Sequence, residues 1–244
     1  MDKLKIYYIN LDSSLERNDF MQKQFMKLKW QVERFSAVNG RELDNRAIFK
    51  KLQKSNSHYT VPSPGEIGIF YSHLNLWRKI ANSNDEFALI LEDDVLIKQE
   101  LNEYLPIILK NLKSFQMFDL SAKKGFFPVK KQRIDTQLEF VQYLTPSLGM
   151  QGRIVGKVFV QKILQKIEGY TKPIDTLLQD YYWHHLEILT SNISFIEHKT
   201  QEVGGSTIQK KKRSVMNKLK REIQRPIYRG VTHIKNLYWM YYDK

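Results

Sequence analysis

Residues 87–97 place three consecutive carboxylates directly between two apolar runs. The segment reads FALIL, then Glu92, Asp93 and Asp94, then VLI. A short, bounded apolar run is typical of a fully buried strand, and ligands of open α/β sheets bind at the carboxyl ends of strands. Adjacent acids repel one another unless a cation or hydrogen-bond donors neutralise them. The segment therefore predicts either a divalent-metal site for a phosphorylated substrate or a solvated acidic turn.

The metal interpretation gives the three acids different roles. Residues two apart in an extended chain point to the same side, so Glu92 and Asp94 are expected to face one ion. Asp93 is then expected to contact a substrate hydroxyl or a metal-bound water. Oxygen ligands of this kind suit Mg²⁺ or Mn²⁺. His198 follows a predicted strand and is a further candidate ligand, although its spacing from the acids forms no known motif.

Strand-like and helix-like segments alternate along the chain, which favours an α/β fold with a mostly parallel central sheet. Strands are predicted at residues 4–11, 31–35, 87–91, 115–120, 141–144, 186–189 and 193–196. Helices are predicted at residues 42–54, 64–77, 100–112, 156–167 and 174–185. Two pairs have the spacing of a capping box at a helix start, Ser13 with Glu16 and Ser63 with Glu66. Residues 121–140 are polar, and their apolar residues follow neither the helical nor the strand spacing clearly.

The composition excludes several classes of protein. The 244 residues contain no cysteine, so a disulfide framework and a thiolate zinc site are excluded. The sequence lacks a run of 18 apolar residues, which argues against a transmembrane helix. Residues 1–11 also lack the order of a signal peptide, so we expect a cytoplasmic protein.

The positive charge is concentrated at the C-terminal end. From Lys210 to Lys244 there are 11 Lys and Arg against 2 acidic residues, which accounts for most of the formal net charge of +13. The division predicts a catalytic domain at 1–208 and a basic tail at 209–244. A basic tail with interleaved apolar residues indicates an anionic membrane surface as partner, and no nucleic acid. We expect the protein to be peripheral on the cytoplasmic face of the inner membrane.

The tail also has a helical pattern. Apolar residues recur at helical spacing on both sides of Pro226, which is expected to break or kink the helix. Basic faces with aromatic ends suit the headgroup region of a membrane. Two alternatives remain open. The apolar stripes can pack back on the domain, or the whole chain can be a non-catalytic adaptor that binds anionic membrane or nucleic acid.

Further polar residues are candidates for chemistry. Asn10 and Arg17 follow the first strand, where a nucleotide often docks, and an Arg fork can pair with a diphosphate. Asp175 and Asp180 are candidate general bases, with helix capping as the more common use of such acids. His73 lies on an otherwise apolar helix, where a satisfied buried histidine is the usual finding. No dinucleotide-binding or Walker motif is present.

Several of these segments occur in one order that resembles glycosyltransferase family 25, the lipooligosaccharide galactosyl- and glucosyltransferases. The matching pieces are YINL with Glu16-Arg17, then AVNG at 37–40, PGEIG at 64–68, Ser72-His73, LILEDDV at 89–95, and Pro-Ile-Asp at 173–175. Each piece alone is weak, but the ordered set is specific. The resemblance covers roughly residues 4–208.

The resemblance implies a GT-A type nucleotide-sugar-binding fold and a metal-dependent, inverting transfer of galactose or glucose. The donor would be a UDP-hexose, the acceptor a lipid-linked lipooligosaccharide or LPS core, and the cofactor Mn²⁺ or Mg²⁺. Asp175 would be the first candidate base and Asp180 the second. The implied donor-binding residues are Asn10, Arg17, Glu66, His73, Glu92 and Asp93, and the implied metal ligands are Asp94, Glu92 and His198.

The chain departs from the family pattern in two segments. An apolar-Lys stretch usually follows Asp-Leu, and here residues 121–125 read SAKKG. A Gly-Tyr-x-Ile pattern is replaced by GMQGRIVG at 149–156. These segments are expected to line the donor or acceptor pocket, so the identity of the sugar does not follow from the resemblance.

Overall fold

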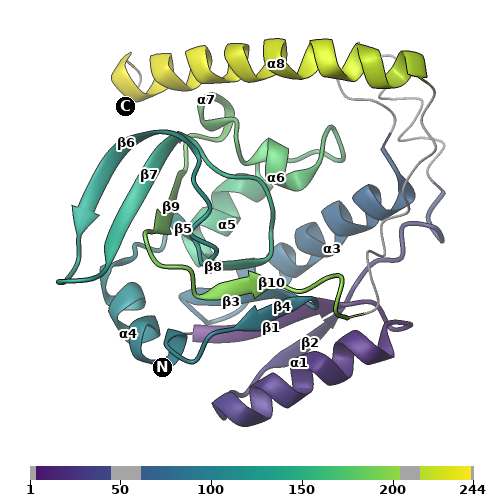
Figure 1. The fold of residues 1–244 in the computed structure, drawn as a ribbon, viewed down its shortest axis with the longest axis vertical. Coiled ribbons are helices and arrows are strands. Elements are labelled where there is room, and N and C mark those ends of the chain that lie inside the picture. The colour runs from purple at the N-terminus through teal and green to yellow at the C-terminus, as the bar shows by residue number, and fades with distance from the viewer. Residues whose placement is uncertain (1–3, 45–61, 204–214, 243–244) are drawn as a thin grey trace.

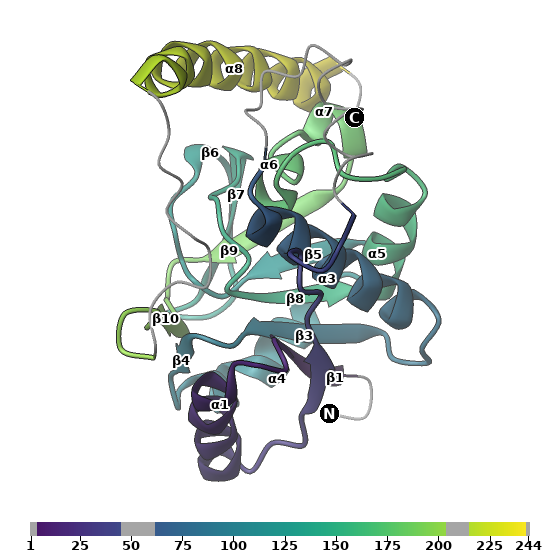
Figure 2. The ribbon, with the colours of Figure 1, turned by 90° about the vertical axis from the view of Figure 1, so that its right-hand side faces the viewer.

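A computed structural model describes residues 4–44, 62–203 and 215–242, without the side chains of residues 215–225. Figures 1 and 2 show a central sheet with helices on both sides and one long helix across one end. In chain order the elements are β1 (Leu4–Asn10), α1 (Leu15–Leu28), β2 (Glu33–Ser36), α3 (Pro64–Ala81), β3 (Phe87–Glu92), β4 (Val95–Ile97), α4 (Leu101–Asn111), β5 (Gln116–Asp119), β6 (Phe126–Arg133), β7 (Glu139–Thr145), β8 (Gly152–Gly156), α5 (Lys157–Leu164), α6 (Ile174–Leu177), α7 (Tyr181–His184), β9 (Glu187–Ser191), β10 (Ile196–His198) and α8 (Val215–Tyr242).

The main sheet has the strand order β2-β1-β3-β8-β5-β9-β7-β6. Six of these eight strands run in one direction, and only β7 and β8 run the opposite way. The expectation of an α/β fold with a mostly parallel sheet is therefore confirmed. A separate ladder pairs β4 with β10 and places His198 opposite Val95, directly after the acidic cluster.

The sheet is covered on both faces, as the continuous apolar strands require. Helices α1 and α4 pack on one face, where Met21, Phe25 and Leu105 join a cluster around Leu89. Helices α3, α5 and α6 pack on the other face, around Ile90. Strand β3 is buried along almost its whole length as a result, and only its last residue is partly exposed.

Two of the motif segments contact each other. A Cβ atom on Gly68 would lie 2.6 Å from the Val38 carbonyl oxygen, and one on Gly40 would lie 1.8 Å from the Pro64 oxygen. A hydrogen bond also joins the two segments, because Ser72 Oγ accepts the Val38 N–H at 2.8 Å. Glycine is needed at both positions because the turn at 37–40 lies directly against the first turns of α3.

The capping-box prediction is confirmed at α3 and wrong at α1. Ser63 and Glu66 form the reciprocal box with Pro64 in the first turn. The first helix instead begins after Ser14, which makes no side-chain cap. The Ser14 carbonyl oxygen accepts from the Asn10 side chain at 3.2 Å, so contacts with β1 fix this helix start.

Two strands of the main sheet were missed by the sequence prediction. Strand β8 occupies a segment for which no strand was predicted, yet all five of its residues are buried between β3 and β5. Strand β6 lies at the sheet edge and is exposed along nearly its whole length, so it has no apolar alternation to detect. The predicted helix at 42–54 falls almost entirely outside the described residues.

The predicted helix at 174–185 is divided into α6 and α7. Asp180 interrupts it with φ −89° and ψ 67°. Its buried carboxylate is bound by Lys172 and accepts the Tyr228 hydroxyl of α8 at 2.8 Å. Contacts made far along the chain thus override the local helical pattern.

Helix α8 continues through Pro226, contrary to the predicted break. A proline removes one backbone donor, and tertiary packing holds the part of the helix that follows it. Asn236 is fully buried and donates to the carbonyl oxygens of Leu144 at 2.9 Å and Gln179 at 2.8 Å. Trp239 is 4% exposed and stacks on His185. The inner face of α8 is therefore part of the folded domain.

His184 gives this packing a pH dependence. It is buried, and burial lowers its pKa to about 3. In the neutral ring Nε2 donates to the Leu178 oxygen and Nδ1 accepts the Leu186 N–H, both at 3.0 Å. The histidine of the unfolded chain has a pKa of about 6.5, so the unfolded state takes up a proton at a higher pH than the folded state. The folded protein is therefore most stable above that pH and loses stability as the pH falls.

We expect His184 to lower the free energy of unfolding by up to about 1.4 kcal/mol for each pH unit below about 6.5. Urea unfolding at several pH values measures this slope. His184→Gln should flatten it, whereas His185→Gln, at an exposed neighbour, should not. If the free energy of unfolding changed equally with pH in the wild type and in His184→Gln, another group would be the one that titrates.

Candidate functional site

The acidic cluster forms a turn between β3 and β4, and β10 adds a histidine to it. Ligand atoms of Glu92, Asp94 and His198 all lie within 4.8 Å of one another. His198 Nε2 is 3.4 Å from Asp94 Oδ2, which also accepts the Thr200 hydroxyl at 2.7 Å. The pairing of β4 with β10 thus brings the three candidate metal ligands together.

These residues fit a divalent cation. Asp94 Oδ1 is buried and has no hydrogen-bond partner among the described residues. Buried carboxylate oxygens are normally bonded, so this atom has capacity for a further ligand. Two carboxylates and one imidazole suit Mn²⁺, because carboxylates favour hard ions and the imidazole favours transition metals.

Asp93 points away from this group and is held by two residues from the beginning of the chain. Asn10 Nδ2 donates to Asp93 Oδ2 at 2.9 Å, and the Arg17 guanidinium donates to Asp93 Oδ1 at 2.6 Å. Arg17 also lies 3.4 Å from Asp94 Oδ2. Burial nevertheless raises the pKa of the Asp93 carboxyl, and the contacts with Arg17 and Asn10 only partly oppose this.

The predicted donor-binding roles of Asn10 and Arg17 change accordingly. Both side chains are buried, and Asn10 uses its amide on Asp93 and its Oδ1 on Arg34. Arg17 also donates to the Val203 carbonyl oxygen at 3.2 Å. We interpret them as positioning residues that hold the acidic turn.

Glu66 and His73 lie on α3 and differ in their surroundings. Glu66 Oε2 accepts both the N–H and the hydroxyl of Ser63, so this carboxylate serves as a helix cap and its predicted donor role has no support. His73 is 1% exposed, and its Nε2 lies 4.0 Å from Glu92 Oε1. Its Nδ1 has no hydrogen-bond partner among the described residues. His73 is thus directed at the acidic cluster and is not a satisfied core histidine.

A second polar network lies beside the first and was not predicted. Asp119 ends β5, and its carboxylate pairs with Arg153 of β8 at 2.9 Å. Arg153 also donates to the Gly149 carbonyl oxygen at 2.6 Å, and the Gly149 N–H donates to Asp175 Oδ2 at 3.1 Å. These bonds fix the loop before β8 and connect it to the predicted base.

Strand order places this network near the acidic cluster. Strands β3 and β5 are separated only by β8, so the ends of β3 and β5 lie about 10 Å apart. The Glu92 N–H donates to the Gln151 carbonyl oxygen at 2.9 Å, and the Lys123 ammonium donates to the Gln151 side chain at 3.1 Å. The two segments that depart from the family pattern therefore meet at this edge of the sheet.

Asp175 and Asp180 are in unlike positions. Asp175 is partly exposed in the first turn of α6, where it accepts from Thr176 and Gly149. Asp180 is 2% exposed and bound by Lys172 and Tyr228. This geometry makes Asp180 an anchor for α8 and argues against its predicted role as a base.

The site therefore consists of acids and a histidine at the carboxyl end of a nearly parallel sheet, which is the position of a ligand site in an α/β protein. A family model described as "Glycosyltransferase family 25 (LPS biosynthesis protein)" matches residues 3–178. The chain belongs to glycosyltransferase family 25.

Relatives within the family carry different names. A "Glycosyltransferase 25 family member" of Anopheles gambiae is 37% identical over 38% of this chain and 17% of its own. The "Putative glycosyltransferase R655" of Acanthamoeba polyphaga mimivirus is 31% identical, over 48% and 36% of the two chains. The human "Procollagen galactosyltransferase 2" is 26% identical, over 46% and 19%. Alignments thus span about a fifth to a third of these proteins.

One solved structure aligns with most of this chain. "4-diphosphocytidyl-2C-methyl-D-erythritolsynthase" from Anaerococcus prevotii aligns over 93% of this chain and 98% of its own, with 11% identity and a TM-score of 0.39. A likeness of this size carries no argument about fold or function.

We expect Asp94→Asn and His198→Gln each to weaken Mn²⁺ binding at least tenfold, because each removes a ligand atom from the three-residue group. Isothermal titration calorimetry measures the affinity. Glu197→Gln is the matched control, since this exposed carboxylate precedes His198 in β10. Unchanged Mn²⁺ affinity in both site variants would refute the metal assignment.

Proposed function

We propose that the protein is a metal-dependent, inverting glycosyltransferase that moves galactose or glucose from a UDP-hexose to a lipooligosaccharide or LPS core acceptor. The observation that carries this is the convergence of Glu92, Asp94 and His198 at the end of β3, in a chain of glycosyltransferase family 25. The fold supports the proposal, because a nucleotide-sugar donor requires a crevice at the carboxyl ends of the strands.

The acidic cluster would hold Mn²⁺ or Mg²⁺, and the ion would neutralise the diphosphate leaving group. The Arg17 guanidinium binds Asp93 and so reduces the electrostatic repulsion among the three carboxylates. Glu92 and Asp94 are left to face the proposed metal site. The His73 Nε2 atom lies 4.0 Å from Glu92 Oε1, so this ring is placed to fix the orientation of the carboxylate.

Asp175 is the proposed general base. In this reaction it takes the proton of the acceptor hydroxyl, whose oxygen attacks the anomeric carbon from the side opposite the diphosphate. The bond to the diphosphate breaks, UDP leaves with the electron pair, and the configuration inverts. The Gly149 and Thr176 N–H groups orient the carboxylate, and the Arg153–Asp119 pair fixes the loop that carries Gly149.

We expect Asp175→Asn to lower the turnover number by about 10²–10⁴-fold, the usual contribution of a general base. Donor KM should change only a few-fold, because the acidic cluster is untouched. Initial rates of UDP release with an acceptor present measure both constants. Asp180→Asn is the contrasting variant and should lower the melting temperature by weakening the contact with α8. Loss of donor binding with normal turnover in Asp175→Asn would make Asp175 a donor ligand instead.

A simple assay separates this proposal from the adaptor alternative. Release of UDP from UDP-galactose or UDP-glucose in the presence of Mn²⁺ is expected of the transferase, and a non-catalytic adaptor releases none. Because one relative is named a procollagen galactosyltransferase, the acceptor panel should include procollagen beside the lipooligosaccharide core.

We further propose that α8 places the enzyme on an anionic membrane, on the cytoplasmic face, where a lipid-linked acceptor lies. None of the described helices is long and apolar enough to cross a membrane. The outward face of α8 nevertheless carries exposed apolar side chains, namely Ile227, Val231, Ile234, Leu237, Tyr238, Tyr241 and Tyr242. The opposite face is held on the domain by Asn236 and Trp239, so the exposed stripe is fixed in direction.

The character of this stripe fits the interfacial region of a membrane. Tyrosines at one end of the stripe suit a headgroup layer, and the same helix carries the exposed cationic residues Arg229 and Lys235. Each Lys or Arg near an anionic surface contributes about 1 kcal/mol. Deleting the tail is a poor test, because the deletion would also expose the surface that Trp239 covers.

We expect Ile234→Ser to reduce binding to mixed phosphatidylglycerol and phosphatidylcholine vesicles about tenfold or more, since burial of such a side chain contributes about 1.5–3 kcal/mol. Vesicle co-sedimentation measures binding, which should also weaken with added salt. Leu15→Ser is the control, because Leu15 is equally exposed at 70% on α1, at the opposite end of the molecule (Figure 1). Equal vesicle binding of both variants, or a dimer in solution that Ile234→Ser disrupts, would contradict the membrane proposal.

A further inference from the structure

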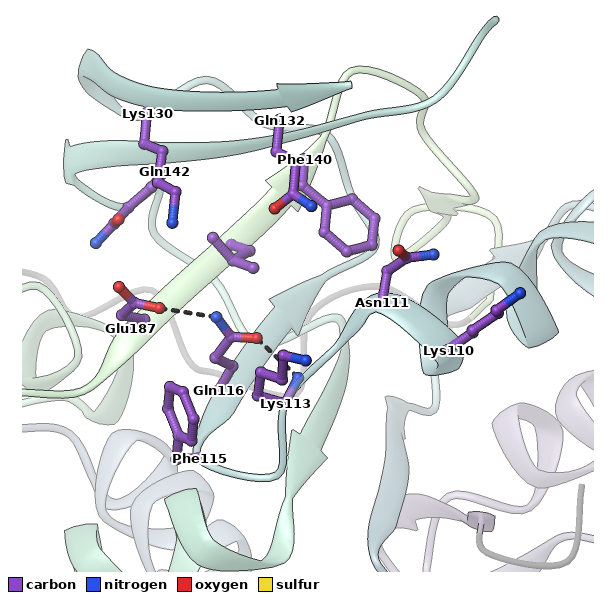
Figure 3. A pocket seen from close by; sticks show the side chains of 11 residues that line it. Lys110, Asn111, Lys113, Phe115, Gln116, Lys130, Gln132, Phe140, Gln142 and Glu187 are labelled. Carbon is purple, nitrogen blue, oxygen red and sulfur yellow. Dashed lines mark hydrogen bonds between the residues drawn. The ribbon is translucent and has the colours of Figure 1, made fainter. Parts of the chain in front are cut away.

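A cavity of about 300 Å³ lies beside Gln116 and Glu187, where β5 and β9 begin (Figure 3). It is bounded by the end of α4 and by β5, β6, β7 and β9. Gln116 and Glu187 begin β5 and β9, whereas Asp119 of the transfer site ends β5. The cavity is therefore separated from that site by the length of the strand, about 10 Å.

The floor of the cavity is formed by fixed amide groups. Gln116 Nε2 donates to Glu187 Oε2 at 2.7 Å, and Gln116 Oε1 accepts the Lys113 N–H at 2.8 Å. Gln142 is 2% exposed, and its Nε2 is buried without a hydrogen-bond partner among the described residues. A buried amide donor without a partner is costly, so this atom indicates a missing acceptor.

The walls are rich in cations. Lys110, Lys113 and Lys130 line the cavity, and among the described residues Glu187 is the only acid that does so. Figure 3 shows the side chains of Lys130 and Gln142 directed toward the Gln116–Glu187 pair. Lys130 and Gln142 are register partners on β6 and β7, so the sheet holds a cation and an amide donor side by side. Lysines on an edge strand also discourage strand pairing, but that use does not explain the buried Gln142 donor.

We propose that this cavity binds a monosaccharide that carries a phosphate or carboxylate group. The lysines neutralise the anionic group, and the amides of Gln142, Gln132 and Asn111 bond to the ring hydroxyls. Phe115, which is 42% exposed at the rim, covers an apolar face of the ring. The volume lies at the lower limit of small-molecule sites and fits one sugar ring. This inference does not depend on the proposed transferase activity.

Ligand-observed NMR and calorimetry on the full chain test the proposal with four probes, namely glucose 6-phosphate, glucuronic acid, glucose and inorganic phosphate. Both anionic sugars should bind, and glucose and phosphate should bind at least tenfold more weakly. Lys130→Gln and Gln142→Leu should each weaken binding of the anionic sugars at least fivefold, while Lys162→Gln, at an exposed lysine of α5, should not. UDP release should be unchanged in all three variants.

Several results would overturn the proposal. No binding of either anionic sugar means that the cavity holds water only. Phosphate binding as tight as glucose 6-phosphate means an adventitious ion only. Displacement of the sugars by UDP would place them in the transfer site. Because UDP release is measured separately, failure here leaves the proposed function unaffected. Circular dichroism of Gln142→Leu separates loss of binding from loss of fold, and Lys130→Gln tests the site without altering a buried residue.

Discussion

Arg17 of α1 donates to Asp93 and lies 3.4 Å from Asp94, and this contact lets the turn after β3 hold adjacent carboxylates in a mostly buried position. Without a buried cation the acids would repel one another and face the cost of desolvation. With Asn10 and Arg17 on Asp93, the cluster is split into one carboxylate that is satisfied inside the protein and two that face His198. The chemistry available at this sheet edge follows from that division.

Strand β8 connects this cluster to the rest of the site. It is inserted between β3 and β5 in the reverse direction, so its first residues lie where those two strands end. Arg153 of β8 binds Asp119 and the Gly149 carbonyl oxygen, which fixes the loop against Asp175. A group that can bind a cation and a carboxylate that can accept a proton are thus held at one edge by backbone pairing.

Much of this arrangement follows from local patterns in the sequence. The FALIL strand and the capping box at Ser63 are each set by a few neighbouring residues, and the structure agrees with both. Glu92 and Asp94 also lie close together, but a turn brings them there and not the alternation of an extended chain. Strand β8 could not be predicted in this way, because it begins and ends with glycines, and Gly156 is required by its close contact with the Ser114 backbone.

The remaining differences also have long-range causes. Asn10 and Arg17 looked available for a nucleotide, but Asp93 lies 83 residues after Asn10 and takes its amide donor. Asp180 was a candidate base within the predicted helix at 174–185, and Tyr228 from α8 makes it an anchor. The exposed edge strand β6 left no hydrophobic period to detect. For Asn10 and Asp180 the deciding partner is distant in sequence, so no local pattern reports it.

The most direct test of this account is an anomalous difference map at the manganese edge, from crystals grown with UDP and Mn²⁺. We expect one strong peak enclosed by the carboxylates of Glu92 and Asp94 and the imidazole of His198, with the UDP diphosphate completing its coordination. A nucleotide bound at this sheet edge with no peak among these three side chains would contradict the metal site. A nucleotide bound elsewhere would contradict the assignment of the whole transfer site.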